Sequence, residues 1–157
     1  QHPFPVEPAD TAWDLYVKGC DVAREHVVAL VDRIEREGLR GAPQDHGAAT
    51  YDPKLTKETA RIDWAQPAGQ IERLMRACRP FQTPHFQYRG KTVLLTHARF
   101  DDKPAGAAPG TVLAVRPEVR VATGCGSVTM VIAYAAAPVP WLWPAPWNRP
   151  KPGEMLE

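Results

Sequence analysis

Residues 51–67 read YDPKLTKETARIDWAQP and form a polar connector that ends on a large aromatic side chain. Two lysines, Lys54 and Lys57, lie three residues apart, and Ile62 and Trp64 follow them. The stretch has no sustained hydrophobic period, and the residues before it are rich in Gly, Pro, Asp and Thr, which is typical of a linker. A linker implies structured elements on either side of it.

One long helix is predicted upstream, after the end of a strand. Asp10 or Thr11 can cap the helix, with Asp14 completing a capping box, and Gly38 ends it. A single helix cannot bury an apolar stripe by itself, so we expect its partner to lie outside this chain, before residue 1. The residues of the stripe recur at three- and four-residue steps: Trp13, Tyr16, Cys20, Ala23, Val27, Leu30 and Ile34.

Downstream, a second helix is predicted from Pro67 to Arg79, because apolar residues keep a helical period there and Pro80 follows. The period then changes to alternation in five short segments punctuated by Gly and Pro. Five strands of this kind favour an α+β fold with a small OB-type β-barrel. The predicted strands are 86–88, 92–100, 111–115, 119–124 and 128–135.

Length and composition limit the class of protein. The chain has 157 residues, 44% of them hydrophobic and 24% charged, which allows a packed core. No apolar run approaches the roughly 20 residues that span a bilayer, so we expect no membrane segment. Three cysteines without metal-ligand spacing favour reduced thiols and a cytoplasmic location.

No catalytic or metal-binding constellation is visible in the residues themselves. The run Gly124–Ser127 faintly suggests a nucleophile elbow, but strands are predicted on both sides, so a hairpin turn is favoured. The five histidines lack the spacing of metal ligands, and we expect them to be surface or packing residues.

Basic and aromatic residues leave two alternatives open. Arg89 and Lys91, with Arg99 and Arg120 on nearby strands, can form a phosphate-contacting patch or an ordinary soluble surface. The net charge is only +1, well short of a strongly basic nucleic-acid binder. The tryptophans of the C-terminal tail can act as stacking platforms or fold back onto their own domain, and the second is favoured. They are Trp141, Trp143 and Trp147.

The connector and its flanks resemble a known family. The run PQDHGAATYDPKLTKETARIDWAQPAGQIERLMRACRP is similar to the domain junction of the methionyl-tRNA formyltransferase family. The long upstream helix resembles the last helix of the family's Rossmann-like catalytic domain. The segments GKTVLLTHAR, APGTVLAV and VRVATGCGSVTMVIA resemble strands of its OB-like C-terminal domain. The resemblance extends over most of the chain, and the connector is its most specific part.

The resemblance implies a domain organisation and a set of binding residues. Ile62 and Trp64 are expected to anchor helix 67–79. The expected parts are the edge and last helix of a catalytic domain (1–44), a linker (45–66), a helix plus OB-like domain (67–140) and a Pro/Trp-rich tail (141–157). The residues expected to contact tRNA or another substrate are Lys54, Lys57, Arg76, Arg89, Lys91, Arg99 and Arg120.

The resemblance also implies an activity for the complete protein, which is formyl transfer from 10-formyltetrahydrofolate to an amine. The family's catalytic asparagine, histidine and aspartate precede the matched part. Since Asn148 is the sole asparagine here, this chain alone is expected to be inactive and to bind no cofactor. Methionyl-tRNA, an amino-sugar nucleotide and an amine on a peptide or carrier protein remain open as acceptors. A stand-alone OB module for nucleic acid, and a docking or oligomerisation module, remain alternatives.

Overall fold

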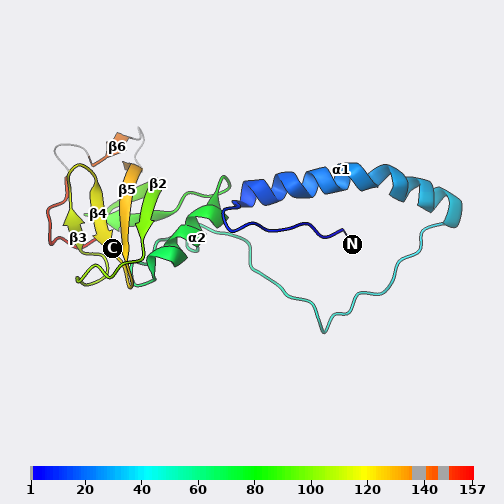
Figure 1. Cartoon of the computed structure of the whole chain (residues 1–157), viewed down its shortest axis with the longest axis horizontal. Helices are drawn as coiled ribbons and strands as arrows, with labels where there is room; N and C mark the ends of the chain where they lie inside the picture. The colour runs from blue at the N-terminus through cyan, green and yellow to red at the C-terminus, as the bar shows by residue number, and fades with distance from the viewer. Residues whose placement is uncertain (1, 136–140, 145–148) are drawn as a thin grey trace. The chain divides into compact units, whose positions relative to one another are not determined.

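The computed structural model describes residues 2–135, 141–144 and 149–157 (Figure 1). The chain divides into two compact units, Gln1–Lys54 and Leu55–Glu157. The first contains helix α1, and the second contains helix α2 and all the strands. In the described part of the chain, no helix is both long and apolar enough to cross a membrane.

Helix α1 (Ala12–Glu37) begins and ends where its sequence predicts. Thr11 is the N-cap and forms a reciprocal capping box with Asp14, which satisfies backbone N–H groups that the first turn leaves free. Gly38 ends the helix, and its N–H donates to the carbonyl of Ile34 at 2.9 Å.

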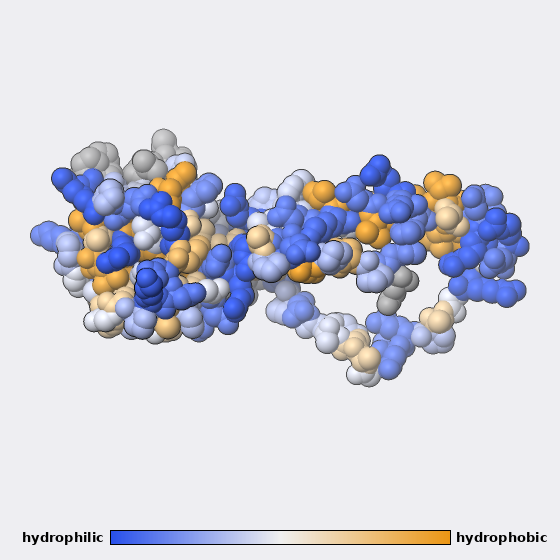
Figure 2. All heavy atoms as spheres, viewed as in Figure 1, coloured by the Kyte–Doolittle hydropathy of each residue, from blue (hydrophilic) through white to orange (hydrophobic). Residues whose placement is uncertain are grey.

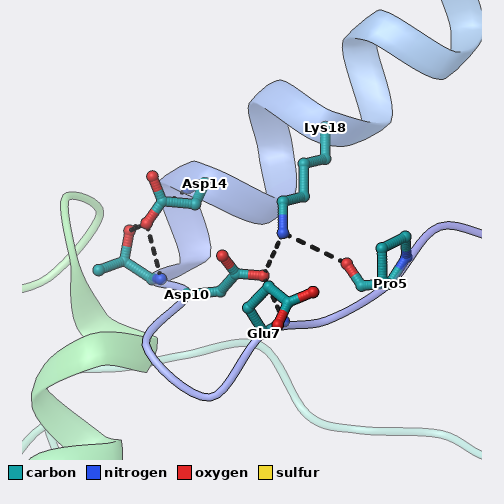
Figure 3. A network of polar contacts seen from close by, with 6 residues as sticks. Pro5, Glu7, Asp10, Asp14 and Lys18 are labelled. Carbon is teal, nitrogen blue, oxygen red and sulfur yellow. Dashed lines mark hydrogen bonds and ion pairs between the residues drawn. The ribbon is translucent and has the colours of Figure 1, made fainter.

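The segment before α1 is not a strand, so the predicted strand end is wrong. Residues 2–11 form no helix or strand, and the ammonium of Lys18 holds this segment to the helix (Figure 3). Its Nζ donates to Asp10 Oδ2 at 2.6 Å and to the carbonyl of Pro5 at 3.3 Å. Three prolines in this short segment lack backbone N–H donors, which disfavours strand pairing.

No residue of α1 is buried. Apolar side chains interrupt the hydrophilic surface along the helix (Figure 2). Trp13 is 49% exposed and Tyr16 is 56% exposed, with their rings stacked at 5.3 Å. Val27 and Leu30 are also about half exposed. The apolar stripe predicted from the sequence therefore remains uncovered in this unit.

In the second unit, α2 (Ala68–Cys78) packs on the barrel through one face, as its period predicts. Ile71, Met75 and Cys78 are buried, and Leu74 is partly buried against the core. Arg79, which precedes a proline, leaves the helical conformation and ends the helix.

The five predicted strands are confirmed, and they form one antiparallel sheet with an OB-like curl. The sheet order is β1-β2-β5-β4-β3, and a further short strand, β6, pairs with β5. Register shifts in the pairing of β2 with β5 mark a β-bulge around residues 95–98. The strands are β1 (His85–Tyr88), β2 (Lys91–Asp101), β3 (Val112–Ala114), β4 (Val119–Ala122), β5 (Ser127–Ala135) and β6 (Trp141–Trp143).

The C-terminal segment, residues 154–157, bridges the two ends of this sheet. On one side, Gln87 of β1 and Glu157 exchange two backbone hydrogen bonds, of 2.6 and 3.1 Å. On the other side, Leu156 N–H donates to the carbonyl of Gly110, and Val112 N–H donates to the carbonyl of Glu154. These bonds satisfy edge groups of β1 and β3 that would otherwise be unpaired.

Aromatic rings fill the centre of the barrel. Trp143 packs edge-on against Phe86 at 5.5 Å and Tyr88 at 5.4 Å, and Trp64 packs against Phe86 at 5.4 Å. Trp143 is only 3% exposed. For this residue the expected folding back of the tail is confirmed, and the stacking-platform alternative is wrong because the ring is inside the core. Trp147 lies outside the described residues.

Candidate functional site

The connector joins the barrel by backbone pairing beside β1. Ile62 N–H donates to the carbonyl of His85 at 2.7 Å, and His85 N–H donates to the carbonyl of Ala60 at 3.1 Å. Ile62 and Trp64 both belong to the core cluster that includes Ile71 of α2. Ile62 and Trp64 therefore share one hydrophobic core with α2, and their role as anchors of the helix stays a prediction.

The turn between β4 and β5 holds the other side of the junction. The carbonyl of Cys125 accepts the N–H of Ala68, the first residue of α2, at 2.8 Å, and Gly124 N–H donates to the carbonyl of Trp64 at 2.9 Å. The Cys125 carbonyl takes the place of a side-chain N-cap, which α2 lacks. Since the turn joins two antiparallel strands, the hairpin interpretation is confirmed and the nucleophile elbow is excluded.

A groove lies against β1, β2 and the end of α2, beside the loop that follows α2. It consists of two hollows of about 450 and 260 Å³ that share Gln82 and Thr83 as lining residues. Thr92 and Thr96 also line it. We call it the Lys57 groove. Its basic and titratable side chains are Lys57, Arg79, His85 and His97.

The described residues that line the Lys57 groove include no aspartate or glutamate. The acidic residue beside the groove is Glu58, which lines a separate hollow of about 530 Å³. The pKa of Glu58 lies below its ordinary value, chiefly because its own backbone N–H and the Thr56 side chain bond to it. The charges of Lys57 and His85 lower this pKa further. The groove therefore offers hydrogen-bond donors and positive charge, which is the chemistry that attracts a phosphate or another anion.

The expected basic residues do not form one patch. Arg99 and Arg120 are both opposite Thr129 of β5, so they lie in one row across three adjacent strands. Arg99 forms an ion pair with Glu118, which neutralises part of that surface. Lys91 lies at the far end of β2, and the bulge between it and Arg99 places the two on opposite faces of the sheet.

Arg89 serves the barrel's own structure. It adopts a left-handed conformation, with φ of 49°, in the turn between β1 and β2. Its guanidinium pairs with Glu154 at 2.8 Å and lies 4.9 Å from the centre of the Tyr88 ring. The Tyr88 hydroxyl donates to Glu154 at 3.1 Å. Arg89 thus helps to hold the C-terminal segment that bridges the sheet.

The two connector lysines belong to different units. Lys54 is the last residue of the first unit, and Lys57 lies in the second and lines the groove. Arg76 is half-buried on α2. Among the residues predicted to contact the substrate, Lys57 lines the groove. Its basic neighbours there, Arg79 and the two histidines, were not predicted, because they come from separate segments without a shared motif.

The described residues contain no cluster of His, Cys, Asp or Glu suited to a metal ion. Their three cysteines, Cys20, Cys78 and Cys125, are free thiols. Burial raises the pKa of the Cys78 thiol, which leaves it a packing residue of α2 and not a reactive thiolate. The groove's chemistry is therefore that of charged and hydrogen-bonding side chains.

Residues 54–136, which are the connector lysines, α2 and strands β1 to β5, match the family described as formyl transferase, C-terminal domain. The chain belongs to this formyltransferase family. A methionyl-tRNA formyltransferase of Nitrosococcus oceani is 35% identical over 130 residues, which are 82% of this chain and 40% of the relative. The chain therefore spans less than half the length of that relative.

Solved structures show the same fold. A variant of HypX from Aquifex aeolicus superposes with a TM-score of 0.63 at 24% identity, over 90% of this chain and 26% of that one. HypX in complex with tetrahydrofolic acid superposes with a TM-score of 0.56, also at 24% identity, over 90% of this chain and 25% of that one. The OB-like formyltransferase fold is thus confirmed, with the Lys57 groove inside the matched region.

Proposed function

We propose that this chain is the C-terminal portion of a 10-formyltetrahydrofolate-dependent formyltransferase and that it holds and orients the amine acceptor. The observation that carries the proposal is the Lys57 groove, a basic, carboxylate-free surface within the family's C-terminal domain. The N. oceani relative is named for methionyl-tRNA. An aminoacyl-tRNA presents phosphates that match the groove, so we favour tRNA as the acceptor.

In the proposed reaction, the acceptor's amine nitrogen attacks the formyl carbon of 10-formyltetrahydrofolate. The bond from that carbon to the cofactor nitrogen breaks, the amine loses one proton, and the cofactor nitrogen gains one. The residues described here do not bring together an asparagine, a histidine and an aspartate, and Asn148 lies outside them. We therefore assign this chain no step of the chemistry and no cofactor ligand. Its contribution is positioning, which lowers the entropic cost of bringing the reactants together.

Binding of tRNA at two salt concentrations tests this proposal. We expect the chain to bind tRNA with an affinity that falls steeply as salt rises, because released counterions drive phosphate binding. Lys57→Ala should raise Kd severalfold and reduce the slope of log K against log salt by about 1. Glu58→Gln should tighten binding, since it removes the negative charge beside the groove.

Lys103→Ala is the matched control, because this exposed lysine lies in the loop between β2 and β3, outside the groove. Equal losses from Lys57→Ala and Lys103→Ala, or binding that does not respond to salt, would contradict the assignment. Formyl transfer by the purified chain on its own would contradict the proposal that this chain binds the acceptor and performs no chemical step. A preference for aminoacylated over uncharged tRNA distinguishes the formyltransferase role from a general nucleic-acid module.

The exposed stripe of α1 favours a second element of the proposal, in which α1 packs against another protein body. In a formyltransferase this body is the catalytic part, and the free thiols are consistent with a cytoplasmic enzyme. Light scattering distinguishes this packing from association of two copies through the same stripe, which Val27→Glu with Leu30→Glu should abolish. A concentration-independent monomeric mass for the wild-type chain would exclude self-association.

A further inference from the structure

The outer face of the sheet carries one row of side chains that continues the Lys57 groove. His85 of β1 is directly opposite Leu94 of β2, and Leu94 is directly opposite Tyr134 of β5. Directly opposed residues of antiparallel strands project to the same face. These three residues therefore form a row that spans three strands, about 10 Å from end to end.

The direction of this row follows from what lies inside the barrel. Phe86, Val93, Leu95 and Ala133 alternate with the row along their strands, and all four are buried. Since successive residues of a strand point to opposite faces, His85, Leu94 and Tyr134 point outward. Tyr134 is 36% exposed, and its strand is paired with β2 at this position.

The row adjoins the hollow of the groove that contains Lys57. His85 and Leu94 line the hollow of about 450 Å³ that Lys57 also lines. Beside the row, Gln87 Nε2 donates to Thr92 Oγ1 at 2.9 Å, so polar side chains border the apolar surface. This face thus carries, in order, the aromatic ring of Tyr134, the aliphatic side chain of Leu94 and the cation of Lys57.

We infer that this row is a stacking platform for one unpaired nucleotide of the RNA acceptor. The base lies on Tyr134 and Leu94, and the phosphate is bound at Lys57. Stacking on an exposed aromatic side chain beside a basic groove is how a β-barrel surface can bind single-stranded nucleic acid without a sequence motif. The hollow is within the range of roughly 300–1,000 Å³ typical of ligand sites.

This inference rests on the proposed acceptor but adds a requirement for a base, which phosphate binding alone does not have. Two probes separate the requirements: a labelled eight-nucleotide oligouridylate and an abasic ribose-phosphate strand of equal length. By fluorescence anisotropy at low salt, the wild-type chain should bind the oligouridylate roughly tenfold more tightly, as expected for one stacked base. Lys57→Ala should weaken binding of both probes by a similar factor.

Variants of Tyr134 then identify the platform. Tyr134→Phe keeps the ring and should retain the preference for the oligouridylate over the abasic strand. Tyr134→Leu keeps apolar area without the ring, and the ratio of the two affinities should fall to near one. Tyr51→Leu is the matched control, since this tyrosine is 82% exposed but lies in the other unit. Near-ultraviolet circular dichroism verifies that each variant is folded.

Each outcome is decisive. Equal wild-type affinity for the two probes, or an unchanged base preference in Tyr134→Leu, overturns the platform but leaves a phosphate-binding groove and the proposed function in place. Binding of neither the probes nor tRNA overturns both proposals. If Tyr134→Leu does not fold, the two probes still decide the matter with the wild-type chain and Tyr134→Phe.

Discussion

At the scale of single residues, the backbone atoms packed against the turn between β4 and β5 require glycine at two of its positions. A Cβ atom on Gly124 would lie 1.9 Å from the carbonyl oxygen of Ala65, and one on Gly126 would lie 2.2 Å from the carbonyl oxygen of Asp101. Both obstacles are backbone atoms, which cannot rotate away as a side chain can. The connector can approach the turn because Gly124 has no side chain, and the end of β2 can approach it because Gly126 has none.

Gly124→Ala should destabilise the second unit by more than about 2 kcal/mol, because the turn or the connector must move to accept a methyl group. Urea unfolding, followed by tryptophan fluorescence, measures the shift of the midpoint. Gly41→Ala is the control, since nothing lies within 4 Å of its added Cβ. A midpoint that is unchanged in Gly124→Ala would mean that the connector does not contact the turn in solution.

Glu154 links three parts of the barrel through its carboxylate. Burial alone would raise its pKa, but hydrogen bonds from the Lys151 backbone, Arg89 and Tyr88 hold the pKa below its ordinary value. Burial, together with the bond to Glu154, raises the pKa of Tyr88 to about 12. Because the folded pKa of Glu154 is depressed, its contribution to stability is present above the ordinary pKa and is lost as pH falls through the folded pKa.

Glu154→Gln should therefore lower the urea midpoint at neutral pH, by an amount equivalent to about 1 kcal/mol or less for this partly exposed pair. The difference from wild type should shrink as pH falls below the ordinary pKa of a glutamate and vanish once pH is also below the depressed folded pKa, because the carboxylate is then protonated in both states. Glu72→Gln, an exposed change on α2, should show no such pH dependence. A deficit that is constant with pH would assign the loss to packing and not to charge.

At the scale of elements, local patterns predicted most of what formed. The capping residues Thr11 and Asp14, the helical period before Pro80 and the alternation of the five strands are all signals within a few neighbouring residues. The contacts that close and complete the barrel are not local. Glu154 and Arg89 are 65 residues apart, and no period in the Pro-rich tail indicates β6 or the bridging segment.

The same distinction explains which parts of the groove were predicted. Lys57 stands in a specific connector run, so the resemblance could place it. His85 and Tyr134 share a row through strand register, because each is opposite Leu94, and two successive register shifts between residues 95 and 98 of β2 reverse the faces of the side chains that follow. The sequence has no glycine at this irregularity to indicate it, so the placement of Lys91 and Arg99 on opposite faces of the sheet could not be predicted.

The bridging segment should carry a measurable share of the barrel's stability. Leu156 is 4% exposed and belongs to the core cluster, whereas its neighbour Met155 is 53% exposed. Leu156→Ala should cost about 2 to 5 kcal/mol, which is the range for truncating a buried leucine. Met155→Ala should change the urea midpoint little, and similar losses from both variants would show that the segment is not docked.

At the scale of the whole molecule, the two units differ in what stabilises them. The second unit has a contiguous core, but α1 depends on its capping box, on the Lys18 contacts and on its own backbone bonds. Residues 39–54, which end the first unit, form no helix or strand, and nearly all of their side chains are exposed, such as Leu39 at 84% and Tyr51 at 82%. Cleavage should therefore concentrate in that segment.

Limited trypsin digestion of the full chain should cut first after Arg40, Lys54 or Lys57 and leave a resistant product that contains the barrel. Intact mass spectrometry identifies the new N-terminus, and a product that begins at Leu55 or Glu58 is expected from the division into units. Cuts inside β1 to β5 at the same rate would contradict a separately packed second unit.

The bridge made by residues 154–157 also bears on how the protein is synthesised. A nascent chain emerging from the ribosome presents β1 and β3 long before the residues that join them. Until residues 154–157 leave the exit tunnel, the backbone groups of Gln87 and Val112 that they pair with are open to pairing with another polypeptide. We therefore expect co-translational chaperones to engage the nascent chain during that interval.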